Sequence, residues 1–409
     1  MDGLAGSRPS LVDSSYAWLR LGVALLLGTI GSVGMWSYVV ALPSVQAEFG
    51  ATRADASLPY TLAMVGFAVG NLLLGRLADR FGILAPILLC IASLGIGYVS
   101  AGLAPTLWVL SAAHVLIGFG SAAFFGPLIA DLSHWFEKRR GIAIAIAASG
   151  NYVAGAVWPP LAQHFIAADG WRMAHLGIGI FCVVAMLPLS LMFRRRLDGH
   201  ADGGAQARGF VAPDIGVSQN TLLLLLCIAG LACCVAMAMP QVHIVAYCGD
   251  LGYGVARGAE MLSLMLAFGI VSRVGSGFIA DRFGGVVTLL IGSVMQAAAL
   301  FLYLLFDGLT SLFVISILFG LFQGGIVPSY AVIIREYFPP QEAGSRVGMV
   351  VMANVFGMAL GGWMSGWIFD LTGSYRAAFL NGLAWNLLNL SVAFWLLRAG
   401  RPGARVATA

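Results

Sequence analysis

The chain has 409 residues, of which 60% are hydrophobic and only 10% are charged. Soluble domains contain about 45–50% apolar and about 25% charged residues, so this composition excludes an ordinary soluble protein. The formal net charge is +4, and the predicted membrane orientation accounts for it, so we expect no nucleic-acid binding. The six cysteines show neither metal-ligand nor disulfide spacing, and we expect no metal and no other cofactor.

Twelve apolar runs are each long enough to cross a lipid bilayer, because about 20 helical residues span its hydrocarbon core. No small-residue cleavage site follows the first run, so we expect no cleavable signal peptide. The sequence therefore predicts an all-α membrane protein with twelve transmembrane helices. The runs are centred near residues 32, 66, 93, 118, 152, 182, 233, 270, 296, 324, 356 and 386.

The basic residues predict the orientation of these helices. With both termini in the cytoplasm, four of the 22 Lys and Arg fall outside and Arg273 lies within the membrane, which leaves seventeen on the cytoplasmic side. This asymmetry follows the positive-inside rule. We expect a multi-pass membrane protein with both termini in the cytoplasm. The four outer residues are Arg53, Arg172, Arg257 and Arg376.

The chain divides into two similar halves. A polar segment, residues 194–219, separates a predicted six-helix bundle (1–193) from a second one (220–409). Residues 75–82 (GRLADRFG) and 277–284 (GFIADRFG) are identical at six of eight positions, at an offset of 202 residues. Two related six-helix bundles predict a cavity between them that opens alternately to each side of the membrane.

The repeated G-x-x-x-D-R-x-G turn resembles the signature of the major facilitator superfamily, and the resemblance covers the whole chain. Within that superfamily the chain resembles the bacterial branch of the monocarboxylate transporter and oxalate/formate antiporter group. The stretches that carry this resemblance are 38–50 (YVVALPSVQAEFG), 135–141 (WFEKRRG), 240–243 (PQVH) and 335–339 (REYFP).

The resemblance implies a mechanical role for the repeated turn. In relatives it latches the two halves together on the cytoplasmic side when the carrier is open to the outside. A tight turn that only anchors the topology is the alternative. The predicted latch residues are Gly75, Asp79, Arg80, Gly277, Asp281 and Arg282.

Arg273 is a charged residue inside the apolar run from Ala259 to Ala280, and no Asp or Glu lies in the middle of any apolar run. An unpaired guanidinium in hydrocarbon costs roughly 2.5–3.5 kcal/mol even on lenient scales, so such a residue normally faces a wet cavity or a ligand. The resemblance places Arg273 on the arginine that binds the substrate carboxylate. An arginine satisfied by backbone carbonyls within the bundle is the alternative.

The remaining charges limit the substrate. Oxalate antiporters present a lysine on helix eleven, whereas residues 344–369 contain none, and Lys138 is the only lysine of the chain. A dianion beside one fixed cation would keep an unpaired charge in low dielectric, which is costly. We therefore expect a small organic monoanion such as lactate or pyruvate. A dicarboxylate or oxalate-type exchanger and an exporter of drugs or metabolites are the alternatives, and no catalytic constellation indicates an enzyme.

Further polar and aromatic residues are candidates for the substrate site. Tyr38 and Tyr330 resemble aromatic cavity residues of the oxalate relatives. Asn151, Gln323 and Asn354, together with Tyr152, either contact the substrate or form hydrogen bonds between helices.

Proton coupling is expected to depend on histidine. The animal monocarboxylate transporters place an aspartate one helical turn before the arginine, where this chain has Gly269. Their proton relay is therefore not transferable. His114 and His243 are the titratable mid-helix candidates, since an imidazole titrates near neutral pH. A buried neutral histidine is the alternative at both positions. We expect a monomer that transports its anion together with a proton.

Overall fold

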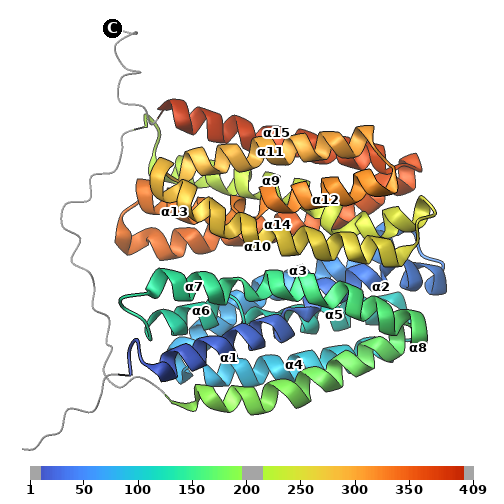
Figure 1. Cartoon of the computed structure of the whole chain (residues 1–409), viewed down its shortest axis with the longest axis horizontal. Helices are drawn as coiled ribbons and strands as arrows, with labels where there is room; N and C mark the ends of the chain where they lie inside the picture. The colour runs from blue at the N-terminus through green and yellow to red at the C-terminus, as the bar shows by residue number, and fades with distance from the viewer. Residues whose placement is uncertain (1–10, 196–214, 400–409) are drawn as a thin grey trace, which may run out of the picture.

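The computed structural model describes residues 11–195 and 215–399. Every regular element in these two ranges is a helix. We call residues 11–195 the first half and residues 215–399 the second half. Figure 1 shows the helices of the first half, coloured blue to green, running alongside those of the second half, coloured yellow-green to red. The predicted boundaries of the two bundles remain a proposal, because most of the predicted linker lies outside the described residues.

The helices of the first half include several that are interrupted within one membrane crossing. They are α1 (Ser15–Gly31), α2 (Val33–Phe49), α3 (Arg53–Phe81), α4 (Leu84–Gly102), α5 (Leu107–Ala122), α6 (Gly126–Ser133), α7 (Arg140–Ala148), α8 (Gly150–Ser190) and the short 3₁₀ helix η1 (Leu191–Arg194).

The helices of the second half are longer on average. They are α9 (Gln219–Asp250), α10 (Val255–Phe283), α11 (Gly285–Leu305), α12 (Leu309–Gln323), α13 (Ile326–Tyr337), α14 (Pro340–Thr372) and α15 (Tyr375–Ala399).

Eleven helical segments of the described chain are long and apolar enough to cross a membrane, and one of them, Arg140–Arg194, has 55 residues. A straight helix of that length would measure about 80 Å, far more than the roughly 30 Å of hydrocarbon that it has to cross. The segment reverses at Gly170, whose φ of 81° and ψ of 161° suit a residue without a Cβ. It therefore crosses twice, and the predicted all-α fold with twelve crossings is confirmed.

The halves repeat in their packing as well as in their turn motif. A Cβ added to Gly118 of α5 would overlap the carbonyl oxygen of Ala63 on α3. In the second half, a Cβ added to Gly320 of α12 would overlap the carbonyl oxygen of Met265 on α10. Both pairs are related by the same 202-residue offset as the turn motif. Small residues thus bring equivalent helix backbones into contact in each half.

The two halves are tied together on one side of the bundle. We call the side where α1 begins and α15 ends the terminal side. On the side opposite to it, Arg53 at the start of α3 forms an ion pair of 3.0 Å with Asp250 at the end of α9. On the terminal side, the described residues form no ion pair between the halves. The structure is therefore closed between the halves on the side opposite the terminal side.

Candidate functional site

A cavity of about 120 Å³ lies between the two halves. The first half contributes residues of α2, α3 and α8 to its wall, and the second half contributes residues of α9, α10, α13 and α14. Most of these side chains are apolar. The polar or partly polar ones are Trp36, Asn151, Tyr152, Gln241, Arg273 and Asn354.

Arg273 is half-buried and reaches this cavity from α10. One terminal nitrogen, Nη1, donates to the carbonyl oxygen of Ala148 at 3.1 Å across the interface between the halves. Its guanidinium carbon lies 4.8 Å from the centre of the Tyr152 ring, whereas its Nε is buried without a partner. A guanidinium has five N–H donors, so one carbonyl and one ring face leave most of its hydrogen-bonding capacity unused.

Two arginines of the described chain are buried more deeply than Arg273, and each pairs with a carboxylate. Arg20 is fully buried and pairs with Asp131 at 2.7 Å. Arg53 is 6% exposed and pairs with Asp250. No Asp or Glu of the described chain lies within ion-pair distance of Arg273. Among the described arginines that are buried or half-buried, Arg273 is thus the one without a carboxylate partner.

Gly269 makes room for the ring that stacks on Arg273. It lies one helical turn before Arg273 on α10, and a Cβ added there would overlap the Tyr152 ring. The ring therefore fills the space beside α10 that a side chain at this position would need. Gly269 thus accounts both for the absence of a carboxylate at this position and for the space that the Tyr152 ring occupies beside Arg273.

The other polar side chains of the cavity are bonded within the protein. The indole Nε1 of Trp36 donates to the carbonyl and side-chain oxygens of Asn151, at 3.2 and 3.1 Å. Gln241 donates to the side-chain oxygen of Gln323 at 2.6 Å, so Gln323 reaches the cavity wall only through Gln241. With its amide oriented for hydrogen bonding, Asn354 donates to the carbonyl oxygen of Gly230 on α9 at 3.1 Å.

The chain matches the profile of the Major Facilitator Superfamily over residues 24–311 and 261–409. It belongs to this superfamily. The members are membrane carriers and not enzymes, so the protein is a multi-pass membrane transporter. The superfamily membership predicted from the repeated turn is confirmed.

Similar proteins with curated names include monocarboxylate transporters. The chain is 27% identical over 392 residues to monocarboxylate transporter 13 of Rattus norvegicus, covering 90% of this chain and 86% of the relative. It is 23% identical over 388 residues to monocarboxylate transporter 4 of the same species, covering 90% of this chain and 80% of the relative.

Solved structures of Major Facilitator Superfamily carriers share the fold. One is a bacterial homologue of the human lysosomal transporter Spinster, with a TM-score of 0.69, 17% identity and coverage of 97% of this chain and 96% of that one. Another is the nucleoside transporter NupG, with a TM-score of 0.71, 15% identity and coverage of 94% and 99%.

Tyr38 and Tyr330 do not line the cavity of this Major Facilitator Superfamily carrier in the present conformation. The Tyr38 hydroxyl donates to the carbonyl oxygen of Ala56 at 2.6 Å, within the first half. The Tyr330 hydroxyl donates to the side-chain oxygen of Asn389 at 2.8 Å, within the second half. Their predicted contact with substrate would therefore require another conformation.

The two candidate histidines are fully buried outside the cavity. Nδ1 of His114 lies 2.8 Å from the carbonyl oxygen of Leu110, and its Nε2 has no partner. Its ring lies 5.8 Å from that of His175, a buried histidine that the sequence analysis did not single out. His243 is bonded through both ring nitrogens, to Tyr375 at 3.2 Å and to Gly362 at 2.8 Å.

The predicted latch residues lie near the ends of α3 and α10, on the terminal side. The side chains of Asp79, Arg80, Asp281 and Arg282 are exposed, and none of them takes part in an ion pair of the described residues. Gly75 and Gly277, the first glycines of the two motifs, have open space where a Cβ would be added. Among the described residues, no ion pair therefore joins the two turn motifs in this conformation.

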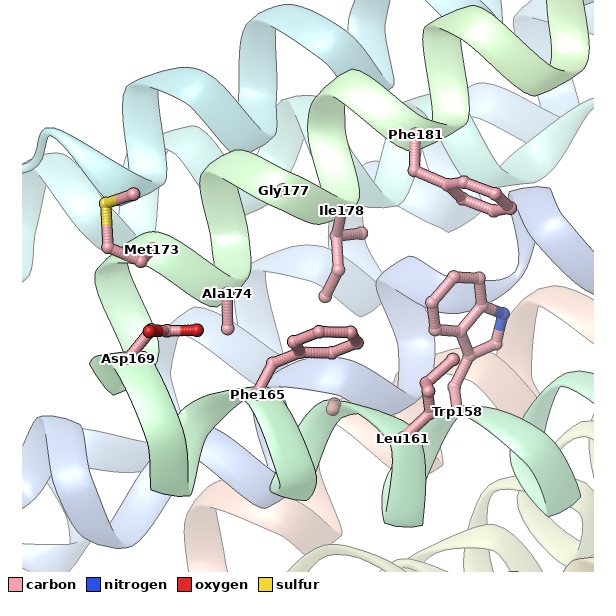
Figure 2. Close-up of a pocket in the computed structure, with 10 residues that line it drawn as sticks. Trp158, Leu161, Phe165, Asp169, Met173, Ala174, Gly177, Ile178 and Phe181 are labelled. Carbon is pink, nitrogen blue, oxygen red and sulfur yellow. The ribbon is translucent and has the colours of Figure 1, made fainter.

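A second, more apolar pocket lies between the two arms of α8. Figure 2 shows Phe165 and Trp158 on one arm facing Ile178 and Phe181 on the other, with Asp169 as the carboxylate among its labelled residues. The pocket has a volume of about 340 Å³ and shares no residue with the cavity between the halves. It belongs to one half, and four of its apolar side chains are exposed, namely Leu161, Phe165, Met173 and Phe181.

Proposed function

We propose that the protein is a secondary active transporter that moves a small organic monoanion, a monocarboxylate such as lactate or pyruvate, by alternating access. The observation that carries this proposal is Arg273, which lines the cavity between the halves without a carboxylate partner among the described residues. A substrate carboxylate supplies the missing charge. The planar guanidinium can bind it through two parallel hydrogen bonds.

The size of the cavity supports a small substrate. Its volume of about 120 Å³ is well below the roughly 300–1,000 Å³ of pockets for drug-sized ligands. A single guanidinium within an apolar wall balances one negative charge, and a second charge would remain unpaired in low dielectric. Among the candidate residues, Asn151 and Asn354 line the cavity with Arg273, and we propose that they contact the substrate.

Two relatives support this substrate class. Monocarboxylate transporters 13 and 4 resemble the chain over 90% of its length, and their names state the class of acid that they carry.

The asymmetry of basic residues supports cytoplasmic termini in a bacterial inner membrane. The terminal side then faces the cytoplasm, and the closed side, with Arg53 and Asp250, faces outward. We propose proton symport by a monomer, with His243 and His114 as the candidate titrating groups.

Ligand-dependent thermal unfolding of the purified full chain tests the proposal. A ligand that binds only the folded protein stabilises it by RT ln(1 + [L]/Kd), roughly 2.7 kcal/mol at a hundredfold excess over Kd. We expect lactate or pyruvate to raise the unfolding temperature more than a dicarboxylate does. The Arg273→Ala variant is expected to lose this shift.

Arg257→Ala is the matched control for this experiment. Arg257 lies on the same helix, and its exposed side chain pairs with Glu260 outside the cavity. This variant should keep the full shift. An undiminished shift in Arg273→Ala would place the anion elsewhere, and a larger shift with dicarboxylates would overturn the proposed monoanion.

A further inference from the structure

A cluster of polar groups joins the halves on the side opposite the chain ends, and Arg53 is its centre. The Nη2 of Arg53 donates to both carboxylate oxygens of Asp250, at 3.1 and 3.0 Å. Its Nη1 donates to the hydroxyl of Tyr375 at 3.0 Å. Its guanidinium carbon lies 4.9 Å from the centre of the Phe369 ring. Arg53 belongs to the first half and its three partners belong to the second, so the side chain is a bond between the halves.

A second carboxylate holds the backbone at the same place. Asp370 of α14 accepts hydrogen bonds from the backbone N–H groups of Arg53 and Ala54, at 2.8 and 2.7 Å. These groups begin α3 and have no partner within their own helix, and the start of a helix also favours negative charge. Gly366 lets α14 approach this closely, because a Cβ there would lie 2.8 Å from the carbonyl oxygen of Arg53.

His243 extends the cluster into the second half through hydrogen bonds whose direction is fixed. Its Nε2 lies 2.8 Å from the carbonyl oxygen of Gly362, which can only accept, so Nε2 carries the hydrogen. In a neutral ring Nδ1 is then an acceptor. The hydroxyl of Tyr375, 3.2 Å away, therefore donates to Nδ1. The oxygen of Tyr375 in turn accepts from Arg53.

We propose that this cluster is the closed outer gate of the transporter and that protonation of His243 opens it. The proposal rests on the alternating access and orientation proposed above, but not on the identity of the substrate. Arg53, Asp250, Asp370 and Tyr375 are gating residues in this assignment. His243 makes the population of the outward-open state depend on the acidity outside, and it does so without having to carry a proton across the membrane.

The sign of the effect follows from the hydrogen bonds. A proton on Nδ1 turns it into a donor, so the hydrogen of the Tyr375 hydroxyl loses its acceptor inside a buried cluster. An unmade buried hydrogen bond is costly. The Tyr375 oxygen would also face two cations, the imidazolium and Arg53, instead of one. The closed gate therefore requires a neutral His243, and a charged ring favours the open state, in which water reaches it.

The surrounding charges do not reverse this sign. The charged groups that act on His243 are Arg53 on α3 and Asp370 on α14, and Asp250 lies two helical turns further along α9. Both carboxylates already have donors, because Asp250 binds the Arg53 guanidinium and Asp370 binds two backbone N–H groups. Within the described residues, the other helices packed on α9 bring no further charge to the ring. Neither carboxylate is hydrogen-bonded to His243 in the closed gate.

Cysteine labelling of the full chain, with no substrate present, tests the gate. Ala54 is buried beside Asp370, whereas Asp55, next to it on α3, is exposed. Ala54→Cys therefore reports opening, and Asp55→Cys corrects the labelling rate for the effect of pH on thiol chemistry. The unsubstituted chain, whose six cysteines are buried or half-buried, gives the background. The rate at position 54 relative to position 55 is expected to rise about tenfold on acidification over the range in which histidine takes up a proton.

Two variants separate the closure of the gate from its response to pH. His243→Gln can still accept from Tyr375 and donate to Gly362, so we expect a gate that stays closed and no longer responds to pH. Arg53→Ala should label rapidly at every pH, because the bond to Asp250 is gone. If Arg53→Ala does not fold, Asp250→Asn removes the same ion pair and should behave alike.

Arg172→Ala is the matched control. Arg172 lies on the same side of the bundle and pairs with Glu48 at 2.8 Å, but both residues belong to the first half. Its loss should leave labelling unchanged. A pH response that survives in His243→Gln, or labelling that falls on acidification, overturns the role of His243. Slow labelling in Arg53→Ala or Asp250→Asn overturns the gate. These results stand apart from the ligand-induced thermal shift, so either proposal can fail alone.

Discussion

Arginine is used in two ways in this fold, and the difference lies in the origin of the partner charge. Arg20 and Arg53 are held by protein carboxylates. Removing one partner of a buried ion pair is strongly destabilising, because it leaves an uncompensated charge. Arg273 instead rests on one carbonyl and one aromatic ring. An anion that binds there can therefore also leave without breaking a structural ion pair, as transport requires.

The ring of Tyr152 is predicted to position Arg273 for the anion. Tyr152→Ala removes the stacking contact, which is worth about 0.5–2 kcal/mol, so the Kd for a monocarboxylate should rise by roughly 2- to 30-fold. Tyr152→Phe keeps the ring, and the Tyr152 hydroxyl makes no hydrogen bond to the described residues. This variant should bind nearly as well as the natural protein. Titration of the thermal shift with ligand concentration measures both values, and equal weakening by the two variants would contradict a role for the ring.

Sequence identified Arg273 because a charge inside an apolar run is unusual wherever it lies. Arg53 could not be recognised in the same way, since it follows a loop and looks like an ordinary outer residue. Its partners Asp250 and Asp370 are 197 and 317 residues away along the chain. Tyr38 and Tyr330 came from resemblance alone, and resemblance does not specify which conformation brings them to the cavity.

At the scale of the helices, the 202-residue repeat governs packing. Gly118 and Gly320 occupy equivalent places in the two halves, and each brings its helix against the backbone of its neighbour. Neither glycine belongs to the turn motif that revealed the repeat. The equivalence therefore extends from a short sequence signature to the contacts in the core of each half.

A methyl group at either glycine should destabilise the fold. Gly118→Ala and Gly320→Ala each place a Cβ onto a backbone carbonyl that cannot move away as a side chain would. Overpacking of this kind costs about 1–3 kcal/mol. Gly22→Ala on α1 is the control, since nothing lies within 4 Å of its added Cβ and alanine favours a helix. Thermal unfolding of the three variants checks this, and a Gly118→Ala protein as stable as Gly22→Ala would contradict the close approach.

The number of crossings followed from length and hydropathy, because both are properties of the local sequence. All twelve predicted runs correspond to crossings once Arg140–Arg194 is divided at Gly170. The interruptions within a crossing, such as those between α5 and α6 or between α12 and α13, do not interrupt the apolar runs. They depend on packing against other helices, and hydropathy does not report them.

For the whole molecule, the ties between the halves are unequal on the two sides. The side opposite the terminal side has an ion pair between the halves and a helix start that is capped across them. On the terminal side, the side chains of Asp79, Arg80, Asp281 and Arg282 are exposed and take part in no ion pair of the described residues. A carrier that alternates needs the reverse arrangement in its other state. We therefore expect the Arg53 cluster and the turn motifs to stabilise opposite states of the carrier. The Arg53 cluster would stabilise the state that is closed on its own side, and the turn motifs would stabilise the other state.

Weakening the proposed latch in the turn motifs should favour the state in which the proposed gate around Arg53 is closed. Asp79→Asn removes a charge from the first turn motif, so Ala54→Cys combined with Asp79→Asn should be labelled more slowly than Ala54→Cys alone, most clearly at acidic pH. Glu137→Gln, an exposed acid on the same side but outside the motif, should have no effect.

Combining Asp79→Asn with Arg53→Ala tests whether the two sites share an equilibrium. Effects at distant sites without common partners usually add in free energy, so the double variant should label between the two single ones. A motif that served only as a topology anchor would leave the double variant labelling as fast as Arg53→Ala alone. That result would mean that the turn motif does not affect the equilibrium between the two states. The proposed role of Arg53 in the gate would be unaffected.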